Sequence, residues 1–166
     1  SFREITMARA RTRDGQTMLA VNDLFVGQRT HLSARYDISW NDRQESQSSS
    51  GIIISTGLGA SGWHRSVMAQ ASGIAECFGG SRLISRGPAW DEKVLTFVVR
   101  EPFPGRRTQA GIVYGRLTER DSFRILSQMP ENGVVFSDGM ESDAIEFNAG
   151  TELTVEISPK RGVLAI

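Results

Sequence analysis

The sequence predicts a mainly β fold, an antiparallel packed-sheet or sandwich domain with one principal helix after a glycine-rich loop. Three observations lead to this prediction. Apolar and polar residues alternate with a period of two over several short segments. Turn dipeptides separate those segments, and a single segment repeats its apolar residues every three or four positions. The 166 residues, 39% of them hydrophobic, suffice for one domain with a buried core.

The N-terminal part of the chain predicts a hairpin followed by a long strand. Asp14-Gly15 lies between two alternating segments, Ile5–Ala10 and Thr17–Val26, and Asp-Gly favours a tight hairpin turn. His31–Trp40 alternates strictly, which predicts a half-buried strand. Its inward residues are Leu32, Ala34, Tyr36, Ile38 and Trp40. The polar run Gln44–Ser50 is short enough to be a strand edge or a loop.

The principal helix is expected between Ser61 and Phe78. Apolar residues recur there at helix spacing; they are Trp63, Val67, Ala71, Ile74, Ala75 and Phe78. Gly79-Gly80 then ends the helix. The apolar run Gly51–Ile54 is typical of a buried strand, so a strand leads through a loop of small residues into the helix.

Four further segments are expected to be strands because they are rich in β-branched and aromatic residues. They are Lys93–Arg100, Ala110–Gly115, Gly133–Phe136 and Thr151–Ser158. We find no internal repeat, low-complexity tract or domain linker in the sequence. Residues 1–166 are therefore expected to form a single domain.

Composition argues against several classes of protein. The chain has 19 Lys and Arg against 19 Asp and Glu, and this neutral balance disfavours a nucleic-acid or membrane partner. No apolar run approaches the roughly 20 residues of a membrane span. The single cysteine, Cys77, excludes an internal disulfide and indicates a reducing, cytoplasmic location. With only His31 and His64, no histidine-based metal site is expected.

The segment from Gly51 to Trp63 carries the most chemical information, because it opens the helix. Free N–H groups at a helix start, with the positive end of the helix dipole, bind anions and polar ligand edges. Glycines let a ligand lie against the backbone, and hydroxyl groups add donors and acceptors, here from Ser55, Thr56 and Ser61. A glycine-rich turn that binds nothing stays open as an alternative.

Two known motifs fit this loop poorly. Gly57, Gly59 and Gly62 match the G-x-G-x-x-G of Rossmann folds. That fold needs a second parallel strand ending at an acid, whereas Glu76 lies inside the helical pattern. A hydrolase nucleophile elbow needs glycine two residues after its serine, and Trp63 stands there.

The loop from Thr56 to Trp63 resembles the Thr-Pro-Thr-Gly-Ser-Thr-Ala-Tyr signature of the NAD kinase family. Asn22-Asp23 is similar to the Asn-Glu motif of that family, and Ser66 matches a serine three positions after its aromatic residue. Phe136-Ser137-Asp138-Gly139 resembles its late Asp-Gly turn. These matches occur in the family's order.

The resemblance is closest to the divergent mitochondrial-type NAD kinases. Those also show Ser-Ser-Gly before the strand, here Ser49-Ser50-Gly51, and the TGxGxxxW loop. They also have a strand ending in Arg-Glu-Pro, here Arg100-Glu101-Pro102. The similarity covers roughly residues 17–160.

The resemblance implies both a fold and a function. In this family, an all-β C-terminal domain carries the helix, and the enzyme transfers the γ-phosphate of ATP, with Mg²⁺, to the adenosine ribose 2′-hydroxyl of NAD. The catalytic aspartate belongs to a Gly-Gly-Asp-Gly motif in an N-terminal α/β domain. This sequence lacks that motif and begins at Ser1 without a leader. We therefore expect a C-terminal dinucleotide-binding domain of a longer polypeptide, with little kinase activity alone, and a homodimer, since the family generally self-associates.

The family's motifs imply a set of substrate-binding residues in this chain. They are Asn22, Asp23, Ser50, Thr56, Ser61, Gly62, Trp63, Ser66 and Asp138. The resemblance implies that Asn22 and Asp23 hydrogen-bond hydroxyl groups of the dinucleotide, which suits an amide and a carboxylate. Trp63 would lie against a ring, or pack in the core as the start of the helix's apolar stripe. Asp138 would bind substrate or anchor its turn.

Three positions depart from the family's pattern. Asp23 is shorter than the usual Glu, Leu58 replaces a polar loop residue, and Ser50 stands where many relatives carry Asp. Two other functions therefore stay open: a lipid or sugar kinase of the same superfamily, and a non-catalytic nucleotide-binding module. Arg106 and Arg107 could approach phosphates or be solvated surface, and the sequence does not decide between NAD and NADH.

Overall fold

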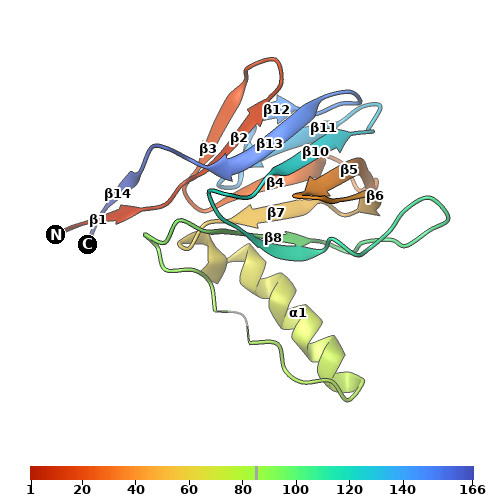
Figure 1. Ribbon diagram of the computed structural model, residues 1–166, viewed down its shortest axis with the longest axis horizontal. Coiled ribbons are helices and arrows are strands. Elements are labelled where there is room, and N and C mark those ends of the chain that lie inside the picture. The colour runs from red at the N-terminus through yellow and green to blue at the C-terminus, as the bar shows by residue number, and fades with distance from the viewer. Residues whose placement is uncertain (85) are drawn as a thin grey trace.

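Two antiparallel β-sheets pack face to face, and α1 lies outside them (Figure 1). The computed structural model describes residues 1–84 and 86–166. The strands are β1 (Phe2–Ile5), β2 (Ala8–Thr12), β3 (Thr17–Ala20), β4 (Asp23–Gln28), β5 (Ala34–Trp40), β6 (Arg43–Ser49), β7 (Ile52–Ser55), β8 (Leu95–Val99), β9 (Tyr114–Leu117), β10 (Phe123–Ser127), β11 (Gly133–Ser137), β12 (Met140–Glu146), β13 (Glu152–Ile157) and β14 (Gly162–Ala165). A short 3₁₀ turn, Gly59–Ser61, leads into the helix α1 (Trp63–Cys77).

The two large sheets share one hydrophobic core. The first sheet has the strand order β3-β2-β13-β10-β5-β6, and the second has the order β12-β11-β4-β7-β8-β9. Their inward faces meet through large side chains that are fully buried, among them Leu24, Tyr36, Ile52, Phe97 and Phe123. A ribbon of β1 and β14 extends from the sheets. The predicted mainly β architecture with one principal helix is confirmed.

The strand boundaries differ from the prediction where the chain changes sheet. The predicted strand Thr17–Val26 is two strands, because the backbone bends at Asn22. β3 belongs to the first sheet and β4 to the second. The predicted strand His31–Trp40 begins only at Ala34, as β5, and Leu32 before it is exposed.

Other segments were only partly anticipated by periodicity. The polar run Gln44–Ser50 belongs almost entirely to β6, which pairs with β5. Of Ala110–Gly115, only the last two residues lie in a strand, β9. β1 and β14 had no predicted counterpart because they are short and largely exposed. β10 alternates, with Phe123 and Ile125 inward, but it is too short for its period to stand out.

Helix α1 contacts the second sheet with its first turns. Trp63, Val67 and Met68 pack against a cluster on the outer face of that sheet, formed by Phe25, Ile53, Val98 and Val134. Farther along, the helix projects away from the sheets (Figure 1). Ile74 and Phe78, the expected continuation of the apolar stripe, are 54% and 88% exposed. The stripe is therefore buried only in the N-terminal half of the helix.

Gly133→Ala tests the packing of β11 against the chain after β12. A Cβ on Gly133 would overlap the backbone carbonyl oxygen of Phe147, so we expect the free energy of unfolding to fall by about 2–3 kcal/mol. Gly73→Ala is the control, because Gly73 lies in α1 with open space around it. Alanine there should stabilise the chain by about 0.5–1 kcal/mol. Urea denaturation measures both, and equal midpoints would contradict this packing.

Candidate functional site

Three neighbouring cavities meet at Trp63, the first residue of α1. The largest has a volume of about 350 Å³, and we call it the Asp23 cavity. Its lining residues are Asn22, Asp23, Leu58, Gly59, Ser61, Gly62, Trp63, Asp138 and Gly139. The structure thus brings together most of the residues expected from the sequence, and places Ser50, Thr56 and Ser66 elsewhere.

Thr56 holds the glycine-rich loop against the crossing from β3 to β4. Its side chain is fully buried, and its Oγ1 donates to the carbonyl oxygen of Val21 at 2.6 Å. Its backbone N–H donates to the carbonyl oxygen of Asn22 at 2.9 Å. Thr56 therefore fixes the loop rather than lining the cavity.

Packing alone requires two of the glycines in this loop. A Cβ on Gly59 would overlap the backbone of Asn22, and a Cβ on Gly57 would overlap the backbone carbonyl groups after Gly87, those of Pro88 and Ala89. A Cβ on Gly62 would lie 3.4 Å from its nearest neighbour, the carbonyl oxygen of Gly59, which is an ordinary contact distance. Gly62 is therefore the loop glycine that leaves the backbone open to a ligand.

Asp138 anchors the same crossing from the β11–β12 turn. It has a left-handed φ of +52°. Its carboxylate accepts hydrogen bonds from three consecutive backbone N–H groups: Val21 at 3.0 Å, Asn22 at 2.6 Å and Asp23 at 3.2 Å. Its own N–H donates to the carbonyl oxygen of Asp23 at 2.9 Å. These contacts favour the anchoring role over direct substrate binding.

The Asp23 carboxyl group is the principal acceptor that the cavity offers. It is half-buried at the start of β4. Burial, and then the negative charge of Asp138, raise the pKa of Asp23 above its ordinary value of 3.8. A ligand with two vicinal hydroxyl groups would supply the donors that an ionised Asp23 lacks here. Asn22 beside it is exposed, so its amide can reach the same ligand.

Trp63 has two partners within the protein. Its indole ring stacks on Phe25 with centroids 5.4 Å apart and an interplanar angle of 10°. Phe25 in turn stacks on Phe136 at 4.9 Å. The guanidinium carbon of Arg100 lies 4.9 Å from the centroid of the Trp63 ring, a cation–π contact. Trp63 therefore has a packing role, and the structure leaves less of its ring surface for a ligand than an exposed aromatic residue would offer.

Ser66 and Ser50 are linked to the site through Arg100. Ser66 lines a cavity of about 160 Å³ on the Trp63 ring, together with Arg100 and Glu101. Ser50 is exposed and lines none of the three cavities. Its N–H donates to the carbonyl oxygen of Arg100 at 2.8 Å, and the Arg100 guanidinium donates to the carbonyl oxygen of Ser50 at 3.4 Å.

Arg100 and Phe25 had no assigned role in the sequence-based expectation. Arg100 belongs to the Arg-Glu-Pro match, and it directly follows β8, which pairs with the strand that leads into the loop. Phe25 is buried on the outer face of the second sheet, whereas its neighbours on β4, Leu24 and Val26, point into the core between the sheets. Glycines at positions 27 and 51 make room for its ring, because a Cβ at either would come within 2.6 Å of it. Gly27 and Gly51 are the sequence signal from which the position of the Phe25 ring could have been inferred.

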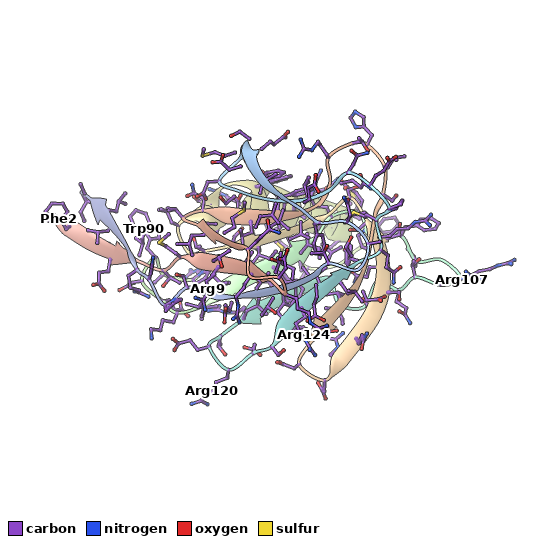
Figure 2. All side chains as sticks on the ribbon, turned by 90° about the horizontal axis from the view of Figure 1, so that it is seen from above. Phe2, Arg9, Trp90, Arg107, Arg120 and Arg124 are labelled. Atoms are coloured by element: carbon purple, nitrogen blue, oxygen red, sulfur yellow. The ribbon has the colours of Figure 1, made fainter. Side chains whose placement is uncertain are left out.

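The remaining residues with open roles fall outside these cavities. His31, Arg106 and Arg107 are exposed, and Figure 2 shows Arg107 at the tip of a projecting loop. Within residues 1–84 and 86–166, no group of three or more His, Cys, Asp or Glu side chains could hold a metal ion. In the same part of the chain, no helix has both the length and the apolar character needed to cross a membrane.

No protein-family model matches the sequence, and no curated protein is detectably similar to it. The fold, by contrast, is similar to solved kinases. An NAD kinase from Archaeoglobus fulgidus in complex with ATP matches 99% of this chain and 55% of its own, with a TM-score of 0.65 and 16% identity. Yeast NADH kinase complexed with NADH matches 99% of this chain and 45% of its own, with a TM-score of 0.67 and 16% identity. This chain thus spans about half the length of each of these kinases, and it shares the fold of the half that it covers.

Asp138→Asn tests whether the Asp138 carboxylate anchors the crossing from β3 to β4. An amide offers one acceptor oxygen where the carboxylate offers two, so at least one of the three N–H groups loses its partner. We expect the free energy of unfolding to fall by about 1–3 kcal/mol in denaturant titrations. Asp143→Asn is the matched control, because Asp143 is exposed on β12. If both variants unfolded at the same denaturant concentration, the anchoring role would be disproved.

Asp23→Asn tests the electrostatics of the cavity. Because the pKa of Asp23 is raised in the folded chain, its ionised form opposes folding above that raised pKa, and the penalty disappears below the unfolded value. We therefore expect the variant to be more stable than the parent at neutral pH, with a difference that vanishes as the pH falls below about 3.8. Thermal melts over this pH range, with Asp42→Asn as an exposed control, measure the effect. A stability difference that is independent of pH would contradict it.

Proposed function

We propose that this chain is the dinucleotide-binding domain of an NAD kinase-like enzyme, which uses ATP to phosphorylate NAD to NADP at the adenosine ribose 2′-hydroxyl. The observation that carries this proposal is the half-buried carboxyl group of Asp23 beside the exposed Asn22 in the Asp23 cavity. A carboxylate and an amide together match the vicinal hydroxyl groups of a ribose. The likeness in fold to kinases bound to ATP and to NADH supports the same conclusion.

Each expected site residue has a role in this proposal. Asn22 and Asp23 bind the ribose hydroxyl groups, while Ser61 and Gly62 border the base at the start of α1. Trp63 separates this part of the ligand from the cavity that holds Ser66, where the rest of the dinucleotide would extend. Thr56 and Asp138 position the loop and the crossing, and Ser50 acts through Arg100.

The domain would position the acceptor and leave the transfer to other residues. Phosphoryl transfer depends chiefly on positioning and on stabilisation of charge. In this proposal, ATP, Mg²⁺ and the catalytic aspartate belong to a Gly-Gly-Asp-Gly domain elsewhere in the complete enzyme, a cytoplasmic homodimer. This chain alone would bind the dinucleotide without turnover.

A non-catalytic nucleotide-binding module is the second candidate. Two observations favour it: Leu58, which replaces a polar residue of the family, lines the Asp23 cavity, and Arg100 lies over the ring of Trp63. A lipid or sugar kinase is the third candidate, and its substrate would offer no ribose to Asn22 and Asp23. A screen of phosphoryl acceptors with the complete protein separates the three, since a module phosphorylates none and a lipid kinase ignores NAD.

Calorimetric titration with NAD and with NADH tests the proposed site. Asn22→Ala and Ser66→Ala each remove a polar group from a predicted ligand contact. We expect each to weaken binding by about tenfold, the worth of one hydrogen bond to a ligand. Ser33→Ala, an exposed serine before β5, should bind like the parent chain. If neither variant changed the affinity for either dinucleotide, the assignment of this site would fall.

A further inference from the structure

The cavity of about 160 Å³ that holds Ser66 is also lined by Arg100, and we call it the Arg100 cavity. Its lining residues are Trp63, Ser66, Val67, Gln70, Arg100 and Glu101. Trp63 lines the Asp23 cavity as well, so the two cavities adjoin at one indole side chain. A ligand too long for the Asp23 cavity can therefore continue into the Arg100 cavity.

Backbone and ring contacts fix the position of Arg100. Its N–H donates to the carbonyl oxygen of Gly51 at 2.9 Å, and its own carbonyl oxygen accepts from the N–H of Ser50 at 2.8 Å. Its guanidinium carbon lies 4.9 Å from the centroid of the Trp63 ring. A guanidinium group that stacks on an aromatic face keeps the N–H groups at its edge available for other partners.

The described residues provide few partners for these N–H groups. The one hydrogen bond that the Arg100 guanidinium makes with them, to the carbonyl oxygen of Ser50, is 3.4 Å long. The nearest Glu101 carboxylate oxygen is 4.0 Å away, which is too far for a hydrogen bond. The Glu101 side chain is 57% exposed, against 28% for that of Arg100, and an ion pair with so exposed a partner contributes little. Arg100 therefore retains donors for an anion in the cavity.

Two polar side chains of α1 line the same cavity. Ser66 and Gln70 are one turn apart, so they are neighbours on one face of the helix. The Ser66 hydroxyl donates to the carbonyl oxygen of Gly62 at 3.5 Å, the limit of a hydrogen bond, so it can donate to a ligand instead. A hydroxyl and an amide NH₂ both donate to phosphate oxygens. The cavity thus combines one positioned positive charge with two neutral donors.

We propose that Arg100 binds the pyrophosphate group of the dinucleotide, whose oxygens also accept hydrogen bonds from Ser66 and Gln70. Arginine forks pair with phosphate oxygens, and the charge makes these hydrogen bonds stronger than neutral ones. This inference rests on the proposed function, because a ribose at Asp23 carries its phosphates into a neighbouring cavity. The third cavity at Trp63, of about 150 Å³, is lined mostly by apolar side chains, which suit a pyrophosphate poorly.

Titrations with NADH and with adenosine test the role of Arg100, because adenosine keeps a base and a ribose but lacks the pyrophosphate. NMR detects weak as well as strong binding, and the backbone N–H resonance of Asp23 reports on both ligands. We expect Arg100→Gln to weaken NADH binding at least tenfold, the worth of a charge-assisted hydrogen bond, and to leave the affinity for adenosine unchanged. Arg100→Lys keeps the charge without the fork, so it should recover part of the affinity for NADH.

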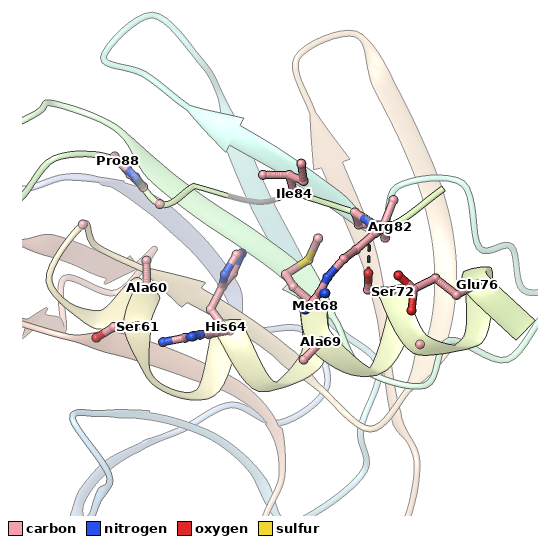
Figure 3. A pocket seen from close by; sticks show the side chains of 15 residues that line it. Ala60, Ser61, His64, Met68, Ala69, Ser72, Glu76, Arg82, Ile84 and Pro88 are labelled. Carbon is pink, nitrogen blue, oxygen red and sulfur yellow. Dashed lines mark hydrogen bonds between the residues drawn. The ribbon is translucent and has the colours of Figure 1, made fainter. Parts of the chain in front are cut away.

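Arg82→Gln is the matched control for the loss of charge. Arg82 lines a cavity of about 610 Å³ on a different face of α1, where Figure 3 shows it with Met68 and Ser72. The substitution removes one positive charge beside the same helix and leaves the lining of the Arg100 cavity intact. Arg82→Gln should therefore bind NADH like the parent chain.

Three results would overturn the role of Arg100 and leave the proposed dinucleotide site standing. Unchanged NADH affinity in Arg100→Gln would exclude the phosphate contact. Equal weakening for NADH and adenosine would mean that Arg100 only supports the Trp63 ring. Equal weakening of NADH binding by Arg82→Gln would reduce the effect to net charge. A parent chain that bound neither NADH nor adenosine would instead refute the proposed function, and this inference with it.

Discussion

The geometry of the candidate site depends on one carboxylate, that of Asp138, which accepts hydrogen bonds from three backbone N–H groups. The chain leaves the first sheet after β3 and enters the second at β4, so the intervening residues cannot use a ladder of either sheet. Backbone N–H groups in such a crossing need partners. Asp138 supplies them for Val21, Asn22 and Asp23 at once. The crossing carries Asn22 and Asp23, two of the polar residues that line the Asp23 cavity, so their placement follows from this contact.

The same contact also has an electrostatic cost. Asp138 holds Asp23 in place, and its charge raises the pKa of Asp23, in addition to the larger effect of burial. The Asp138 carboxylate accepts three N–H hydrogen bonds, whereas no described residue donates a hydrogen bond to the Asp23 side chain. The two acids are therefore unequal, and the unsatisfied one faces the cavity. Such an asymmetry is common at binding sites, where a polar group lacks a partner in the protein because the ligand provides it.

Periodicity was sufficient for the fold class and for the helix, because both depend on the spacing of apolar residues along the chain. Periodicity failed at Thr17–Val26, where an unbroken β-like pattern conceals a change of sheet that hydrogen bonds from distant residues, Asp138 and Thr56, stabilise. Motif resemblance grouped Asn22, Asp23, Ser61, Gly62 and Trp63, and the structure places them in one cavity. It gave no role to Arg100 or Phe25. Their positions depend on strand register and on the side of the sheet that the helix covers, and neither can be read from a local motif.

The glycine-rich loop separates two cavities, the Asp23 cavity and a larger one beside α1. On one side Gly59 lies against the backbone of Asn22, and on the other Gly57 lies against the carbonyl groups after Gly87. A Cβ on Gly87 would in turn come within 2.5 Å of the side chain of Ala60. Small residues are therefore required here by close backbone packing, whether or not a ligand is bound. The loop has little room to move relative to either neighbour, and Ser61 lines both the Asp23 cavity and the cavity of about 610 Å³ beside α1.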